Sequence, residues 1–187
     1  NEIKARKKQH LKLAASKDSH YQKLTTGFEN YRFIHCALPE MDLSEISLNT
    51  EFMGYDLSCP LMINPISGGE ENGKDLNRAL AKVAAQEKIA LSLGSIRPAL
   101  DSPECLTSFN VVSNYTQDIP LIVNIGCLQI KKEEERTKLL KLCDKLNADA
   151  VSIHLNPLQE IIQPEGGTNF KGILKELEKF NNSAEIP

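Results

Sequence analysis

Several features that would assign a protein to a class at once are missing from this chain of 187 residues. It has no Trp and only 5% aromatic residues, which argues against the stacking platforms of single-stranded nucleic-acid binders. Its formal net charge of -3 excludes nucleic-acid binding by bulk positive charge. No apolar run approaches the ~18 residues of a membrane span, and no GxGxxG motif follows the first strand-like run. What remains is an ordinary globular composition, long enough for one sizeable core.

The cysteines show neither disulfide nor zinc spacing. There are five of them, an odd number with no CxxC pair: Cys36, Cys59, Cys105, Cys127 and Cys143. We expect reduced thiols in a cytoplasmic protein, several of them in apolar surroundings. Residues 1–17 are basic and broken by charges, so they are no secretory signal.

The first third of the chain has weak periodicity. Residues 2–17 have the spacing of a weakly amphipathic helix, and residues 25–44 are expected to be irregular. Residues 45–58 carry β-type side chains with turn residues at 53–56, which predicts a short hairpin.

From Pro60 onward, apolar strand-like runs alternate with helical patterns. Strands are predicted at 61–66, 89–93, 120–126 and 150–154, and helices at 74–88, 133–146 and 171–180. In the first helix the expected apolar face comprises residues 76, 79, 80, 83 and 84. Acidic residues 133–135 open the second helix, where they suit the positive end of the helix dipole.

Apolar strands that alternate with helices predict an α/β fold with a parallel sheet. Each unit repeats the order strand, polar cluster, helix, which favours a TIM (β/α)₈ barrel over an open sheet. Such a barrel takes about 250 residues, and only four βα units are visible. We therefore expect residues 1–187 to be a single domain that forms the N-terminal half of a barrel. Within it, 1–58 are an extension with a short hairpin and 59–187 are the first βα units.

Polar clusters follow the four predicted strands, where α/β barrels keep their chemistry. They are Ser67-Gly68-Gly69, Gly94-Ser95-Ile96-Arg97, Asn124, and the run from His154 to Glu160 that is followed by Gln163-Pro164-Glu165-Gly166. Glycines let backbone amides approach a planar or phosphorylated ligand, and a lone Glu near basic residues suits Mg²⁺ with phosphate. For each motif taken singly, a purely structural role is commoner than a functional one. The glycines would then form an ordinary turn, His154 would be a hydrogen-bonded core histidine, and Glu160 a surface carboxylate. Their recurrence at successive strand ends is what indicates an enzyme site.

A basic cluster near the start could bind an anion. Arg6 and His10 are four residues apart and Lys7 and His10 three apart, so on a helix the three converge. Arg offers phosphate a bidentate fork, Lys a point charge and His a further donor. The commoner alternative is a solvated basic helix.

In these motifs the chain resembles the type II, flavin-dependent isopentenyl-diphosphate isomerases. The resemblance rests on Arg6-Lys7-x-x-His10, His35-x-Ala37-Leu38-Pro39-Glu40, Ser67-Gly68-Gly69, Gly94-Ser95-x-Arg97, Asn124-Ile125-Gly126, the heptad His154 to Glu160, and Gln163-Pro164-Glu165-Gly166. Those enzymes usually have Thr where Ser67 stands and Gln where Ile96 stands.

The resemblance implies an FMN-containing TIM barrel that interconverts isopentenyl and dimethylallyl diphosphates for isoprenoid biosynthesis, with Mg²⁺ and with NADPH as reductant. It implies substrate binding by Arg6, Lys7, His10, Ser95, Arg97, His154, Asn156 and Gln159. It implies FMN contacts from Pro65, Ile66, Ser67, Gly68, Ser95 and Asn124, and magnesium binding by Glu160. The reduced flavin is expected to act as the acid and base itself, with Gln159 as the nearest side-chain candidate.

Two alternatives stay open. One is another FMN-dependent TIM-barrel oxidoreductase, which would need a catalytic His from the half of the barrel beyond these units. The other is a truncated, non-catalytic half-barrel. Small-molecule diphosphate is the expected partner, with no nucleic acid and no membrane, and a homo-oligomer is expected.

Overall fold

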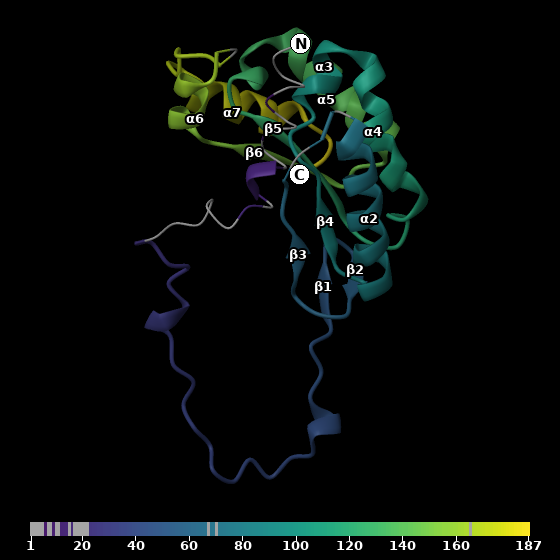
Figure 1. Cartoon of the computed structure of the whole chain (residues 1–187), viewed down its shortest axis with the longest axis vertical. Helices are drawn as coiled ribbons and strands as arrows, with labels where there is room; N and C mark the ends of the chain where they lie inside the picture. The colour runs from purple at the N-terminus through teal and green to yellow at the C-terminus, as the bar shows by residue number, and fades with distance from the viewer. Residues whose placement is uncertain are drawn as a thin grey trace.

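A computed structural model describes residues 6, 9, 12–14, 16, 23–66, 68–69, 71–164 and 166–187. Its centre is a four-stranded parallel sheet in the order β3-β4-β5-β6. The strands are β3 (Met62–Ile63), β4 (Ala90–Ser92), β5 (Leu121–Gly126) and β6 (Ala150–His154). The four predicted strands and their parallel pairing are confirmed, with β3 shorter than expected. The sheet is an open arc here and not a closed barrel (Figure 1).

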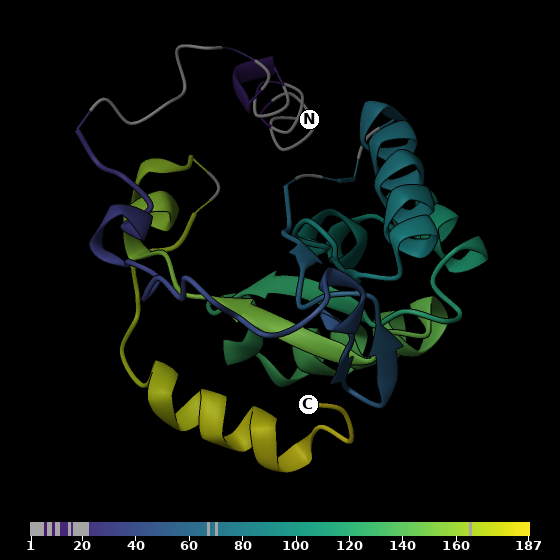
Figure 2. The ribbon, with the colours of Figure 1, turned by 90° about the horizontal axis from the view of Figure 1, so that it is seen from below.

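Three long helices cover the outer side of this sheet. They are α2 (Glu71–Glu87), α5 (Glu133–Leu146) and α7 (Ile173–Ser183), and Figure 2 shows α2 and α7 flanking the sheet. All three were predicted, and α5 has the predicted bounds. It ends at Asn147, which takes the left-handed conformation that favours Asn at helix ends. The core between sheet and helices includes Leu91, Val123, Leu139 and Phe180.

The buried face of α2 differs from the predicted one. Val83 is 47% exposed, whereas Asn77 and Ala81 are buried. Asn77 Nδ2 donates a 2.9 Å hydrogen bond to Ser108 O. This bond orients the Asn77 face of α2 toward the segment that contains Ser108. The apolar period alone could not show this, because the buried stripe contains an amide.

Several short helices were not anticipated from the sequence. Between β4 and β5 the chain forms α3 (Arg97–Asp101), η4 (Pro103–Leu106), α4 (Thr107–Asn110) and η5 (Val111–Asn114). After β5 comes η6 (Gln129–Lys131), and after β6 comes α6 (Pro157–Ile162). Proline at the first turn of α3, η4 and α6 was the available signal.

The N-terminal part extends away from the sheet. The 3₁₀ turns η2 (Phe28–Asn30) and η3 (Leu43–Glu45) interrupt an otherwise irregular stretch, which confirms that prediction (Figure 1). The predicted hairpin is also confirmed: β1 (Thr50–Phe52) pairs antiparallel with β2 (Tyr55–Leu57). Most of the helix predicted over 2–17 lies outside the described residues, although residues 6, 9 and 12–14 are helical.

All five cysteines are free thiols, and Cys105, Cys127 and Cys143 are buried, as expected. Within the described part of the chain, no helix combines the length and apolarity needed to cross a bilayer.

Candidate active site

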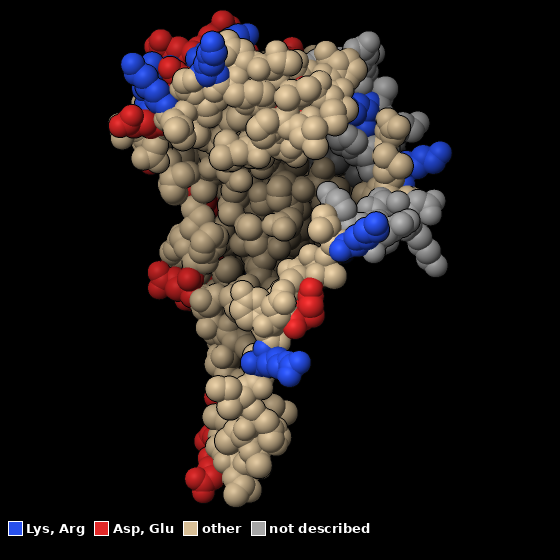
Figure 3. Space-filling view, turned by 90° about the vertical axis from the view of Figure 1, so that its left-hand side faces the viewer, with Lys and Arg blue, Asp and Glu red and all other residues tan. Residues whose placement is uncertain are grey.

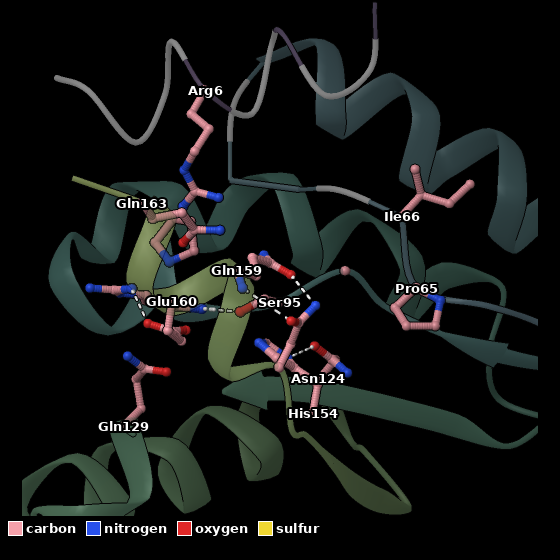
Figure 4. A pocket seen from close by; sticks show the side chains of 14 residues that line it. Arg6, Pro65, Ile66, Ser95, Asn124, Gln129, His154, Gln159, Glu160 and Gln163 are labelled. Carbon is pink, nitrogen blue, oxygen red and sulfur yellow. Dashed lines mark hydrogen bonds and ion pairs between the residues drawn. The ribbon is translucent and has the colours of Figure 1, made fainter. Parts of the chain in front are cut away.

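A pocket of about 220 Å³ lies at the carboxyl ends of the four parallel strands (Figure 4). Each of the four strand ends contributes to it, because parallel strands deliver these ends to one edge of the sheet. Its lining comprises Arg6, Pro65, Ile66, Gly94, Ser95, Arg97, Pro98, Asn124, Gln129, His154, Asn156, Gln159, Glu160 and Gln163. The polar clusters of separate βα units therefore meet in one place.

Asn124 and His154 form a hydrogen-bonded pair across neighbouring strands. Asn124 Oδ1 lies 2.9 Å from His154 Nδ1. An amide oxygen can only accept, so this contact requires the proton on Nδ1. Asn124 Nδ2 lies 3.5 Å from Ser152 Oγ, which stands opposite Asn124 in the β5–β6 register. The buried amide thus sets the orientation and tautomer of the imidazole.

Glu160 is a buried carboxylate, only 5% exposed. Its Oε2 lies 3.8 Å from Arg97 Nη1 and accepts a 3.4 Å hydrogen bond from the Gly167 N–H. Burial raises the pKa of the neighbouring Cys127 thiol, and the negative charge of Glu160 raises it further. A carboxylate held at low exposure beside one guanidinium is a suitable ligand for a hard cation.

Helix α6 places both Glu160 and Gln159. Asn156 caps the helix, and its Oδ1 accepts a 3.1 Å hydrogen bond from the Gln159 N–H. Asn156 Nδ2 in turn donates to Gln159 Oε1 at 3.1 Å. Pro157 occupies the first turn, where its fixed φ suits a helix start. The run from His154 to Glu160 is therefore a strand end followed by a capped helix.

The Gly94-Ser95-Ile96-Arg97 turn is attached to β5. The Ile96 N–H donates a 2.9 Å hydrogen bond to Asn124 O, and the Arg97 N–H lies 3.5 Å from Ser95 Oγ. Ile96 itself is fully buried in the core. Ser95 and Arg97 line the pocket while the side chain between them packs away from it.

The glycine pair after β3 has a packing role. A Cβ at Gly68 would collide with the Phe109 ring. Gly69 has φ of 91°, and its N–H donates a 2.9 Å hydrogen bond to the buried Ser108 Oγ. Gly68 is not among the residues that line the pocket, and Ser67 lies outside the described residues.

Of the predicted basic cluster, only Arg6 can be placed. It lines the pocket, close to Gln163 (Figure 4). Lys7 and His10 lie outside the described residues, so their assignment stays a prediction.

Two glutamines of the pocket were not among the predicted site residues. Gln129 begins η6, three residues after the end of β5, and Gln163 follows α6. Position after a strand end was a usable signal for Gln129, whereas only the tertiary structure brings Gln163 to the pocket.

The pocket has two chemically different ends. Pro65 and Ile66 form an apolar wall on one side, and Glu160 and Arg6 lie on the other (Figure 4). Among the described residues, no group of three His, Cys, Asp or Glu side chains could hold a metal ion. The apolar wall beside the Asn124 amide fits a planar cofactor such as FMN.

Comparison with known proteins identifies the class. Residues 1–152 match the family model of FMN-dependent dehydrogenases, so the chain belongs to this family. Membership of this family implies a TIM-barrel fold and FMN as cofactor. The open parallel α/β sheet is consistent with part of such a barrel.

Curated relatives give a more specific resemblance. The chain is 35% identical, over its whole length, to an isopentenyl-diphosphate delta-isomerase of Nostoc sp.. It is 38% identical over 97% of its length to the enzyme of that name from Synechococcus sp., and 36% identical over its whole length to that of Cronobacter sakazakii. The chain spans 53%, 52% and 54% of these three relatives, about half their length. The resemblance inferred from the motifs is confirmed.

Proposed function

We propose that the protein to which this chain belongs interconverts isopentenyl and dimethylallyl diphosphates, with FMN and Mg²⁺ as cofactors and NADPH as the reductant of the flavin. The observation that carries the proposal is the two-ended pocket. An apolar wall of Pro65 and Ile66 suits a flavin and a hydrocarbon chain, and the end with Arg97 and Glu160 suits a diphosphate with a metal ion.

At the charged end, Arg6, Lys7, His10, Ser95 and Arg97 would hold the diphosphate and Glu160 the magnesium ion. Binding energy from this end, remote from the reacting carbons, holds the alkene in position. His154, Asn156 and Gln159 would line the substrate chain. The Asn124–His154 hydrogen bond keeps the imidazole in one orientation, which a precise placement of the alkene requires.

At the apolar end, Pro65 to Gly68, Ser95 and Asn124 would contact FMN. When bound, reduced FMN supplies the proton transfer that side chains perform poorly on an unactivated alkene. The reaction needs no net redox change, so the protein's task is orientation and exclusion of water.

The test is conversion of isopentenyl diphosphate, followed by ¹H NMR under anaerobic conditions with FMN, NADPH and Mg²⁺. We expect dimethylallyl diphosphate to accumulate, and we expect Glu160→Gln to lower kcat/KM by at least about a hundredfold because it removes the carboxylate ligand. Gln86→Met, on an exposed part of α2, is the matched control and should retain wild-type activity.

The family match also supports a second candidate, an FMN-dependent dehydrogenase. Oxidation of a 2-hydroxy acid, with flavin bleaching and no isomerisation of the diphosphate, would decide for it against the isomerase.

A further inference from the structure

Three polar side chains converge above the backbone of Gly126, at the end of β5. A Cβ placed on Gly126 would lie 3.1 Å from His154 Nε2 and 3.3 Å from Glu160 Oε1, and would collide with Gln129 Oε1. Glycine therefore leaves a small space bounded by an imidazole, a carboxylate and an amide oxygen. Gln129 is the one member of this group to which neither the motifs nor the proposed function assigns a role.

The backbone that carries Gln129 is firmly anchored. Arg136 Nη1 donates a 2.9 Å hydrogen bond to Ile130 O, and the same atom lies 2.8 Å from Glu176 Oε2. Lys131 Nζ donates to Asn169 O at 2.8 Å, and Ile130 is fully buried. Helices α5 and α7 thus fix the turn η6, and the side chain of Gln129 extends from a rigid base.

We propose that Gln129 supplies, through Oε1, a second protein oxygen to the divalent cation held by Glu160. The inference rests on the proposed function, which places the cation at this carboxylate. Hard cations select carboxylate and carbonyl oxygens, and one carboxylate with one amide oxygen leaves four octahedral positions for water and diphosphate. Glu160 is the one carboxylate among the described residues that line the pocket, and the side-chain oxygen of Gln129 lies beside it at the Gly126 backbone.

If the Gln129 side-chain amide were flipped, a different effect on cation binding would be expected. If Gln129 instead donated an N–H to the Glu160 carboxylate, it would steady that ligand without touching the ion. A glutamate at 129 separates the two roles. As a second oxygen ligand it keeps or strengthens cation binding, whereas as a neighbour without the ion it repels Glu160 and weakens binding.

The experiment is a titration of the protein with Mn²⁺, which shares the ligand preference of Mg²⁺, in the presence of inorganic diphosphate. The electron paramagnetic resonance signal of free Mn²⁺ reports binding without any turnover, after correction by a protein-free titration at the same diphosphate concentration, because diphosphate itself binds Mn²⁺. We expect Gln129→Met to raise the Kd of Mn²⁺ about tenfold. We expect Gln129→Glu to match or tighten the wild-type Kd and Glu160→Gln to abolish binding, with Gln86→Met as the unchanged control.

The outcomes separate the two proposals. Wild-type affinity in Gln129→Met, or weakened binding in Gln129→Glu, overturns the role of Gln129 while a loss in Glu160→Gln keeps the cation at Glu160. Wild-type affinity in Glu160→Gln overturns the cation site of the proposed function itself. Circular dichroism identifies a variant that fails to fold, and if Gln129→Met does so, Gln129→Glu alone decides.

Discussion

At the scale of single residues, burial distinguishes functional side chains from ordinary ones. Sequence alone would class Glu160 as an ordinary surface carboxylate, yet it is 5% exposed, and its Oε2 lies beside the Arg97 guanidinium and accepts from the Gly167 N–H. The His154 imidazole is likewise set apart by its hydrogen bond to Asn124 Oδ1, which fixes its tautomer. Burying a charge is costly unless it is paired, and a cation bound at Glu160 would contribute to that pairing.

Gly126 is the most sensitive position for the space between these groups. Replacement by Ala puts a methyl group against Gln129 Oε1 and close to His154 Nε2 and Glu160 Oε1. We expect Gly126→Ala to weaken Mn²⁺ binding about tenfold or more while the far-ultraviolet circular dichroism spectrum stays native. Unchanged Mn²⁺ affinity in a folded variant would show that this space is not part of the cation site.

The cysteines should differ sharply in reactivity. Burial raises the pKa of Cys143 to about 12, and the charge of Asp144 contributes, so almost no thiolate exists at pH 8. Cys36 is exposed. We expect a thiol reagent such as DTNB to modify Cys36 quickly and Cys143 at least roughly a thousandfold more slowly until guanidinium unfolds the protein. Rapid reaction of all five thiols under native conditions would contradict the buried positions.

At the scale of elements, short connections and not the long helices build the site. The Asn156 cap starts α6, a helix that was not predicted, and Arg136 of α5 holds η6 in place. Arg136 also pairs with Glu176 of α7 at 2.8 Å, with both side chains largely shielded from solvent. The contact between α5 and α7 therefore also positions η6, which carries Gln129 at the edge of the pocket.

The Arg136–Glu176 pair should make stability depend on pH. Hydrogen bonds from Lys179 and then from Arg136 lower the pKa of Glu176 below its ordinary 4.5. The stabilisation is therefore present above pH 4.5 and is lost as pH falls through the lowered value. We expect Glu176→Gln to lower Tm by a few degrees at pH 7 and by progressively less in acid. Glu178→Gln on the same helix, at an exposed position, is the control. A pH-independent difference in calorimetry would rule out a charge effect.

The loop after β3 depends on one buried hydroxyl of α4. Ser108 Oγ accepts the Gly69 N–H at 2.9 Å and donates to Cys105 O at 2.8 Å. Ser108→Ala removes the acceptor, so we expect a loss of about 1–3 kcal/mol in the free energy of unfolding measured with urea. Ser113→Ala, which removes a hydroxyl bonded to Asn110 near the surface, should cost less. Equal losses of unfolding free energy in the two variants would mean that the buried Ser108 hydroxyl contributes no more to stability than a hydroxyl near the surface.

At the scale of the whole molecule, the described residues of 23–49 expose many apolar side chains. Figure 3 shows one face of the molecule with a recessed middle whose atoms are mostly neither Lys or Arg nor Asp or Glu, and with charged residues around it. Apolar side chains such as Phe33 and Ile34 are 104% and 97% exposed. Exposed apolar surface of this kind favours association.

We propose accordingly that the protein self-associates. For the 187-residue chain of 20.8 kDa, sedimentation velocity at tens of micromolar should show species larger than the monomer. Replacing both Phe33 and Ile34 by Ser should shift the distribution toward the monomer, since the exposed apolar area falls. A single 20.8 kDa species for the wild type would contradict the proposal.

The sequence by itself determined the alternation of strands and helices and therefore the parallel sheet. It also placed polar residues at successive strand ends, and family motifs indicated FMN, Mg²⁺ and a diphosphate before any geometry was known. These properties follow from local periodicity and from residue type, which a single chain segment carries within itself.

Only the tertiary structure decided which of these residues meet. Gly68, whose contact with the cofactor stays a prediction, packs against Phe109, while Gln129 and Gln163, which were not predicted, line the pocket. Which face of α2 is buried depends on the hydrogen bond between Asn77 and Ser108, two residues 31 positions apart. Such contacts depend on strand register and on side-chain packing across the whole sheet, and no window of sequence contains both partners.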